Sequence, residues 1–269
     1  MTKKDYSLQA FASSRVYCAV FGKRHGTFFT IEVNKKQYCI TAKHLAKQLN
    51  YSSDGRADIS VPRSTSLFSI PVKLVGHGEA DVDISVLTAE YVMGKPEPLM
   101  EPIAPEYGED AFFFGFPYLQ EARTGVAMGI DASIPFVKKG IISYISRNGR
   151  FCISEQVTEG FSGGPVIMIG RYGTKKSHDV FYHVIGVTTA YRPTDIPVVG
   201  DNEESDNESS LIAKANSGIM VAHDIKFALD IIESNPIGFS IKTKALRKPK
   251  SQRKSKPKSK SPRNPGIDL

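Results

Sequence analysis

The chain is divided into many short apolar runs, each closed by turn-forming residues, and this pattern constrains its fold most. Runs such as RVYCAVFG, GTFFTIEV, KGIISYIS and HVIGVTTAY are rich in Val, Ile, Phe and Tyr. They are typical of β-strands, and many strands at close spacing favour a barrel or a sandwich. One late run, DIKFALDIIES, instead places Ile225, Leu229 and Ile232 at helical spacing behind Asp224 as N-cap. A shorter helical turn is expected in HLAKQL, after His44.

The positive charge of the chain belongs to its C-terminal end. The net charge is +7, from 35 Lys and Arg against 28 Asp and Glu. Eleven of the basic residues and one acid, Asp268, follow Ile241, so the body keeps 24 basic and 27 acidic residues. A nearly neutral body argues against a nucleic-acid-binding fold. Residues 241–269 are mainly Lys, Ser and Pro, which predicts a disordered basic tail.

A second polar segment, RPTDIPVVGDNEESDNESSLIAKANSG, covers residues 192–218 and is acidic at its centre. We predict that it is an irregular insertion and that 200–210 form a mobile loop.

Three widely spaced cysteines, Cys18, Cys39 and Cys152, fit neither a disulfide framework nor a metal-ligand cluster. We expect buried, reduced thiols, and we expect no metal and no cofactor. The basic N-terminus lacks the apolar core of a signal peptide, and no run has the length of a membrane span. The sequence therefore predicts a cytoplasmic protein of undetermined oligomeric state.

One stretch, TEGFSGGPVIMIG, places Ser162 among three glycines. A serine hydroxyl is a poor nucleophile unless a base removes its proton and a third group orients that base. His44 follows the apolar run YCITA, and Asp83 begins the run DISVL, with Asp81 two residues earlier. Each of the three candidates therefore adjoins a predicted strand that could carry it into a shared cleft.

These segments resemble trypsin-like serine peptidases of the chymotrypsin fold. GFSGGPV resembles the nucleophile motif, TAKH the histidine motif and DISVL the aspartate motif of that family. Further segments match in the same order: GTFF at 26–29, FFFGFP, KGIIS and VIGVTTA. The resemblance covers about residues 16–232 and is nearest the bacterial HtrA-like members, although the chain leaves no room for a PDZ domain and lacks the usual disulfides.

The resemblance implies an all-β fold of two antiparallel β-barrels of the chymotrypsin/trypsin type with a C-terminal helix. Residues 8–100 would form the barrel that carries the histidine and the aspartate. Residues 101–240 would form the barrel that carries the serine and the helix.

It also implies a role for each site residue. His44, Asp83 and Ser162 would form the catalytic triad of a serine endopeptidase acting on polypeptides. The backbone N–H groups of Gly160 and Ser162 would form the oxyanion hole. The substrate-binding residues would be Gln156, near the base of the specificity pocket, and Thr189, Ala190 and Tyr191, which would pair with an extended substrate.

The residue before the serine of the nucleophile motif, Phe161, also differs from that of many relatives. Phe161 stands where secreted relatives have an aspartate that pairs with a newly cut N-terminus, so we expect Phe161 to hold the turn by apolar burial.

Two other functions stay open. The chain could be an inactive trypsin-like module that binds peptides. Alternatively, the basic segment 242–263 could bind nucleic acid or an anionic surface and carry the main role, with binding that weakens steeply as salt increases.

Overall fold

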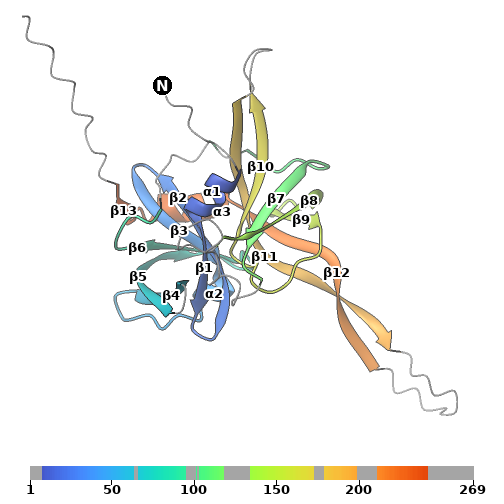
Figure 1. Ribbon diagram of the computed structural model, residues 1–269, viewed down its shortest axis with the longest axis horizontal. Coiled ribbons are helices and arrows are strands. Elements are labelled where there is room, and N and C mark those ends of the chain that lie inside the picture. Colours follow the sequence, from blue (N-terminus) through green and yellow to red (C-terminus); the bar gives the residue numbers. More distant parts are fainter. Residues whose placement is uncertain are drawn as a thin grey trace, which may run out of the picture.

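The protein folds into two closed antiparallel β-barrels that lie side by side (Figure 1). The computed structural model describes residues 8–63, 66–94, 101, 103–117, 134–172, 179–198 and 211–241. The predicted two-barrel architecture is confirmed. The predicted border near residue 100 and the basic tail beyond residue 241 lie outside the described residues, so the domain limits stay a prediction.

The first barrel closes in the strand order β3-β2-β1-β4-β5-β6, with β6 paired back to β3. Its strands are β1 (Val16–Phe21), β2 (Arg24–Val33), β3 (Lys36–Ala42), β4 (Arg56–Arg63), β5 (Ser66–His77) and β6 (Ile84–Ala89). A short C-terminal strand, β13 (Phe239–Ser240), pairs with the start of β3. The C-terminal end of the described chain is therefore attached to the first barrel.

The second barrel closes in the order β10-β11-β12-β9-β8-β7. Its strands are β7 (Asp110–Gly115), β8 (Phe136–Ile145), β9 (Arg150–Ser154), β10 (Pro165–Tyr172), β11 (Asp179–Val198) and β12 (Leu211–Asp224).

Alternation along the strands builds three apolar cores. Along β2, Phe28 points into the first barrel, whereas its neighbour Phe29 points into the core between the barrels. Because side chains of a strand alternate between its two faces, a strand that is buried on both faces needs a continuous apolar run. The run TFFTI meets this need, and every residue in it is buried.

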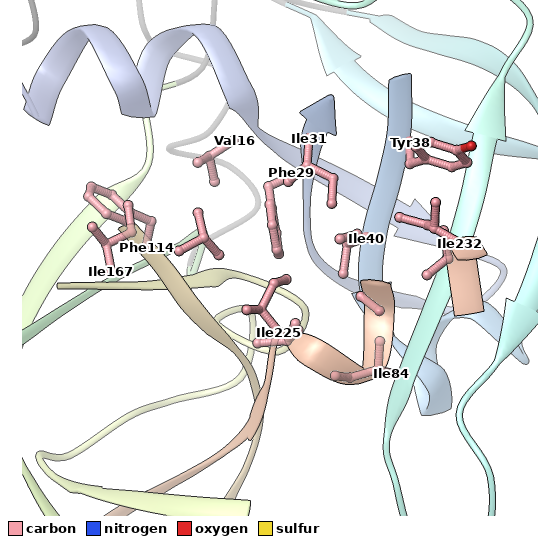
Figure 2. Packing of buried hydrophobic residues seen from close by; sticks show 14 of the residues in the cluster. Val16, Phe29, Ile31, Tyr38, Ile40, Ile84, Phe114, Ile167, Ile225 and Ile232 are labelled. Atoms are coloured by element: carbon pink, nitrogen blue, oxygen red, sulfur yellow. The ribbon is translucent and has the colours of Figure 1, made fainter. Parts of the chain in front are cut away.

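The core between the barrels holds them together (Figure 2). Ile31 and Ile40 from the first barrel belong to the same buried cluster as Phe114 and Ile167 from the second. The predicted C-terminal helix is present as α3 (Lys226–Ser234) and packs here, mainly against β5 and β6 of the first barrel. The Asp224 carboxylate accepts from the N–H of Lys226 at 2.8 Å, as expected for a capping residue, although the helix itself begins after Ile225.

A helix that the sequence did not predict, α1 (Leu8–Arg15), covers one side of this core. The ring of Phe11 lies 6.2 Å from the rings of both Phe114 and Tyr182 of the second barrel. Its buried Arg15 guanidinium also pairs with the Glu32 carboxylate of β2 at 2.6 Å. Helix α1 therefore bridges the two barrels.

The prediction of an irregular insertion over residues 192–218 is wrong at both ends. Residues 192–198 extend β11 and residues 211–216 belong to β12, and together they form a two-stranded ribbon that leaves the barrel (Figure 1). Hydrogen bonds between the two strands supply the order that the polar sequence does not suggest. The predicted mobile loop at 200–210 lies outside the described residues.

Candidate active site

Ser162 lies in a tight turn that connects β9 to β10 within the second barrel. Gly160 precedes it with φ of +95°, a conformation that a residue with a Cβ rarely adopts. A Cβ at Gly160 would also overlap the carbonyl oxygen of Phe116. The turn therefore requires glycine at this position for two independent reasons.

Thr27, on β2 of the first barrel, fixes the orientation of this turn. Its N–H donates to Ser162 O at 2.9 Å, and its hydroxyl donates to Gly160 O at 2.6 Å. Thr27 is fully buried and its own carbonyl accepts from the hydroxyl of Thr41 at 2.7 Å. With both carbonyls held by Thr27, the N–H groups of Gly160 and Ser162 donate to no other described residue. They are available to a ligand.

Phe161 anchors the same turn from the other side. Its side chain is 2 % exposed, and its ring packs edge-on against Phe113 at 5.5 Å within the core of the second barrel. The expectation of apolar burial at this position is confirmed. Phe161 has no carboxylate, so at this position packing holds the turn, together with the bonds from Thr27.

His44 and Asp83 lie next to each other because each adjoins one of two paired strands of the first barrel, β3 and β6. His44 lies on the short helix α2 (Lys43–Ala46), which begins immediately after β3, and Asp83 directly precedes β6. The Asp83 carboxylate accepts from the backbone N–H of His44 at 2.8 Å and contacts its ring Nδ1 at 2.7 Å. Contact through both carboxylate oxygens fixes the position and the rotation of the imidazole. A proton on Nδ1 leaves Nε2 free to act as a base.

A cleft of about 440 Å³ between the barrels brings these residues together. Its lining includes His44, Asp83, Gly160, Ser162, Thr189, Ala190 and Tyr191. In this structure the hydroxyl of Ser162 donates to Thr189 O at 3.2 Å rather than to His44.

Gln156 is the predicted site residue that the structure does not bring to the cleft. Its side chain is exposed, its backbone carbonyl accepts from Lys138 Nζ, and it does not line the cleft. The lining on this side consists instead of Val157, Thr158 and Glu159. The Gln156 side chain lies beside Gly218 of β12 instead, and its place in a specificity pocket stays a prediction.

The outer edge of β11 is open beside Ser162. Pairing of β11 with β10 ends at Val187, whereas its pairing with β12 continues through Ala190 and Tyr191. Within the described residues no strand covers the outer edge from Thr189 onward. Such an edge can accept an extended polypeptide as an additional strand.

His223, near the end of β12, is a residue beside the site that none of the sequence motifs includes. It is 5 % exposed, and its Nδ1 lies 3.1 Å from the hydroxyl of Thr189. Burial lowers the pKa of His223 from its usual 6.5, while the nearby Asp83 carboxylate opposes this shift. His223 therefore contacts Thr189 of the open strand edge and interacts electrostatically with Asp83. No local sequence pattern indicates this position.

We predict that His223 makes the stability of the protein depend on pH. Because its pKa is lowered on folding, the unfolded chain binds this proton at a higher pH than the folded chain. The stability that neutral His223 provides should be complete above about pH 6.5 and lost as the pH falls toward the lowered value. Between about pH 7.5 and pH 5, the melting temperature of the wild type should therefore decrease more than that of His223→Gln.

A matched comparison is available in His77, whose pKa is also lowered, first by burial and then by Lys47 and Lys43. His77→Gln should remove a separate part of the same dependence, and the two effects should add. An unchanged pH slope in His223→Gln would contradict the assignment.

Other potential ligand groups are dispersed. The described residues contain no group of three or more His, Cys, Asp or Glu side chains placed to hold a metal ion. Cys18, Cys39 and Cys152 are buried, and burial raises the pKa of Cys39 to about 12. Within the described part of the chain, no helix is both long and apolar enough to span a membrane.

Comparison with solved structures identifies the fold. A serine endoprotease from Yersinia pestis superposes with a TM-score of 0.50 at 18 % identity, over 84 % of this chain and 65 % of that one. The fold is that of trypsin-like serine proteases. The HtrA-type protease AlgW, solved with a tripeptide, superposes with a TM-score of 0.48 at 17 % identity, over 84 % of this chain and 61 % of AlgW. Both structures extend well beyond the matched part.

Sequence comparisons add no relative. No protein-family model matches the chain, and no curated protein matches it.

Proposed function

We propose that this protein is a serine endopeptidase that acts through His44, Asp83 and Ser162. The observation that carries the proposal is the contact of both Asp83 carboxylate oxygens with His44 in the cleft that Ser162 lines. A histidine oriented in this way beside a serine on a glycine-rich turn is the arrangement that activates a hydroxyl nucleophile.

The reaction follows from the positions of these groups. When a peptide enters, the Ser162 hydroxyl leaves Thr189 O, passes its proton to His44 Nε2, and Oγ attacks the peptide carbonyl carbon. The oxyanion accepts from the free N–H groups of Gly160 and Ser162. His44 then gives the proton to the leaving amine as the C–N bond breaks, and a water activated by His44 hydrolyses the acyl-enzyme ester. Asp83 stabilises the charged imidazole throughout.

The substrate would be held as an extended strand on the open edge at Thr189, Ala190 and Tyr191. Backbone pairing of this kind requires a locally unfolded polypeptide. The test is incubation of the purified protein with a fluorescently labelled unfolded polypeptide, with Ser162→Ala purified in parallel. Cleavage by the wild type alone supports the proposal, and equal or absent cleavage contradicts it.

A second candidate is a peptide-binding module without activity, and one observation favours it. The Ser162 hydroxyl is bonded to Thr189 O instead of His44. Catalytic hydrogen bonds are often longer or misaligned without substrate, so this geometry is compatible with both candidates. Binding of the labelled polypeptide without cleavage would support the module. The cytoplasmic location and the binding of polyanions by 242–263 stay predictions.

We predict that Gly160→Ala removes one oxyanion donor. An L residue in a left-handed conformation costs about 1–2 kcal/mol, and the methyl group would also overlap Phe116 O. The turn must rotate, and loss of one donor lowers kcat by about 10²-fold to 10³-fold.

Gly108→Ala is the matched control, because Gly108 has φ of +87° but nothing within 4 Å of the added Cβ. It should lower the melting temperature slightly and leave kcat unchanged. Equal kcat values for the two variants would contradict the oxyanion assignment.

A further inference from the structure

Three successive residues at the turn between β1 and β2 form a basic wall of the cleft: Lys23, Arg24 and His25. Lys23 and Arg24 are exposed, and neither forms an ion pair with another residue of the described ranges. The Nε2 atom of His25 is buried and has no hydrogen-bond partner there. Buried polar atoms without a partner are rare, because each loses its bonds to water. The cleft is therefore lined by two exposed basic side chains, Lys23 and Arg24, that no acidic residue of the described ranges neutralises, with His25 beside them.

The strand that carries the basic wall and the open strand edge contact Ser162 through different atoms. On β2, Thr27 bonds directly to Ser162 O, and Arg24 precedes Thr27 by three residues. At about 3.3 Å per residue, this places the Arg24 backbone about 10 Å along the strand from that bond. Thr189, on the other side, accepts from the Ser162 hydroxyl. If an extended polypeptide pairs with Thr189–Tyr191 on the acyl side of the cleaved bond, its leaving-group side is left to contact the basic wall in the same cleft.

We propose that this site selects polypeptides with an Asp or Glu side chain within about three residues on the leaving-group side of the cleaved bond, since two to three residues of extended chain span the 10 Å to the basic wall. The inference rests on the proposed peptidase function. The substrate carboxylate would accept from the Arg24 guanidinium, while Lys23 adds a second positive charge.

The negative charge of Glu159 strengthens the preference for an acidic residue on the leaving-group side. Glu159 adjoins Gly160, lines the same cleft, and forms no ion pair within the described ranges. An acidic substrate side chain next to Glu159 would be repelled, whereas one at the basic wall would be attracted. The two charges together fix the position of the acidic residue relative to the cleaved bond.

The experiment first maps cleavage sites in a mixture of unfolded proteins by mass spectrometry. The best-cleaved sequence is then made as fluorogenic peptides with Glu or Gln at each of the first three positions after the cleaved bond. At one of these positions kcat/KM should be roughly tenfold higher for Glu than for Gln, since two exposed basic side chains attract the carboxylate. This ratio should decrease with added salt, because exposed charges are screened beyond about 10 Å at 0.1 M.

Variants assign the preference to the basic wall. In Lys23→Glu/Arg24→Glu the ratio of kcat/KM for Glu over Gln should fall to 1 or below. Lys214→Glu is the matched control, because Lys214 is an exposed base on β12 that does not line the cleft. It should keep the wild-type ratio.

Binding of the same peptides to Ser162→Ala, measured by fluorescence anisotropy, separates the two proposals. Cleavage with equal rates for Glu and Gln at all three positions overturns the selectivity and leaves the peptidase function intact. If the wild type cleaves nothing in the protein mixture, the peptidase function is overturned, and the acidic selectivity is retained only if a fixed extended peptide binds Ser162→Ala more tightly with Glu than with Gln. Absence of both binding and cleavage contradicts both.

Discussion

Replacing Ser162 with alanine is expected to abolish peptide cleavage while the fold stays intact. The methyl group removes the nucleophile, and only binding and oxyanion stabilisation remain, which supply about 10³-fold to 10⁴-fold over the reaction in water. His44→Ala should have an effect of similar size, because the hydroxyl without its base is a poor nucleophile. The double variant should be no less active than either single variant, since the two groups act as a unit.

The measurement is kcat/KM on one fluorogenic peptide, with the melting temperature as a test of folding. Ser69→Ala is the matched control, because its hydroxyl bonds to Asp58 on the exposed surface of the first barrel. It should leave kcat/KM unchanged. Additive losses in the double variant would show that Ser162 and His44 do not act together.

Replacing Asp83 with asparagine should lower turnover by about 10⁴-fold. The side-chain amide can keep one bond to the backbone N–H of His44, but its NH₂ group stabilises the imidazole tautomer with the proton on Nε2. That tautomer cannot accept the proton of Ser162. Asp83→Asn should therefore leave the shape of the cleft unchanged, but Nε2 of His44 could no longer act as the base.

Asp81→Asn is the internal comparison, because Asp81 lies two residues earlier, is exposed, and does not line the cleft of Ser162. Its kcat/KM should stay within about threefold of the wild type, an effect typical of exposed charges. Similar losses at Asp81 and Asp83 would contradict the assignment of the orienting carboxylate.

Much of the fold could be predicted because its determinants are local. Continuous apolar runs such as those of β2 and β3 reflect burial on both strand faces, and Ile225, Leu229 and Ile232 mark the helix that closes the core. The helix α1 was missed, although Leu8, Phe11 and Ala12 have the spacing i, i+3, i+4. Its length of two turns gives too weak a periodicity to separate it from a terminal segment.

The elements that depend on distant partners could not be predicted. The ribbon at 192–198 contains Pro193 and Pro197 and few apolar residues, and its order comes from pairing with 211–216. The short strand β9 is recognisable only from its place between β8 and β12. In both cases pairing with β12 supplies order that the local sequence does not indicate.

The candidate site likewise contains residues that local motifs predict and contacts that no local motif predicts. The residues His44, Asp83 and Ser162 stand in motifs with a recognisable chemical reason. The bond from Thr27 to Gly160 O joins residues 133 positions apart, and the contact of His223 with Thr189 spans 34. No local pattern indicates such contacts.

Reaction with a fluorophosphonate probe tests the central claim most directly, because this reagent forms a covalent bond only with a serine that a neighbouring base has activated. The purified full-length protein is incubated with the probe, and the labelled residue is identified by mass spectrometry. One label is expected on Ser162 in the wild type, and none is expected on Ser162 in His44→Ala. A folded wild-type protein that stays unlabelled, or that is labelled equally with and without His44, would contradict the claim.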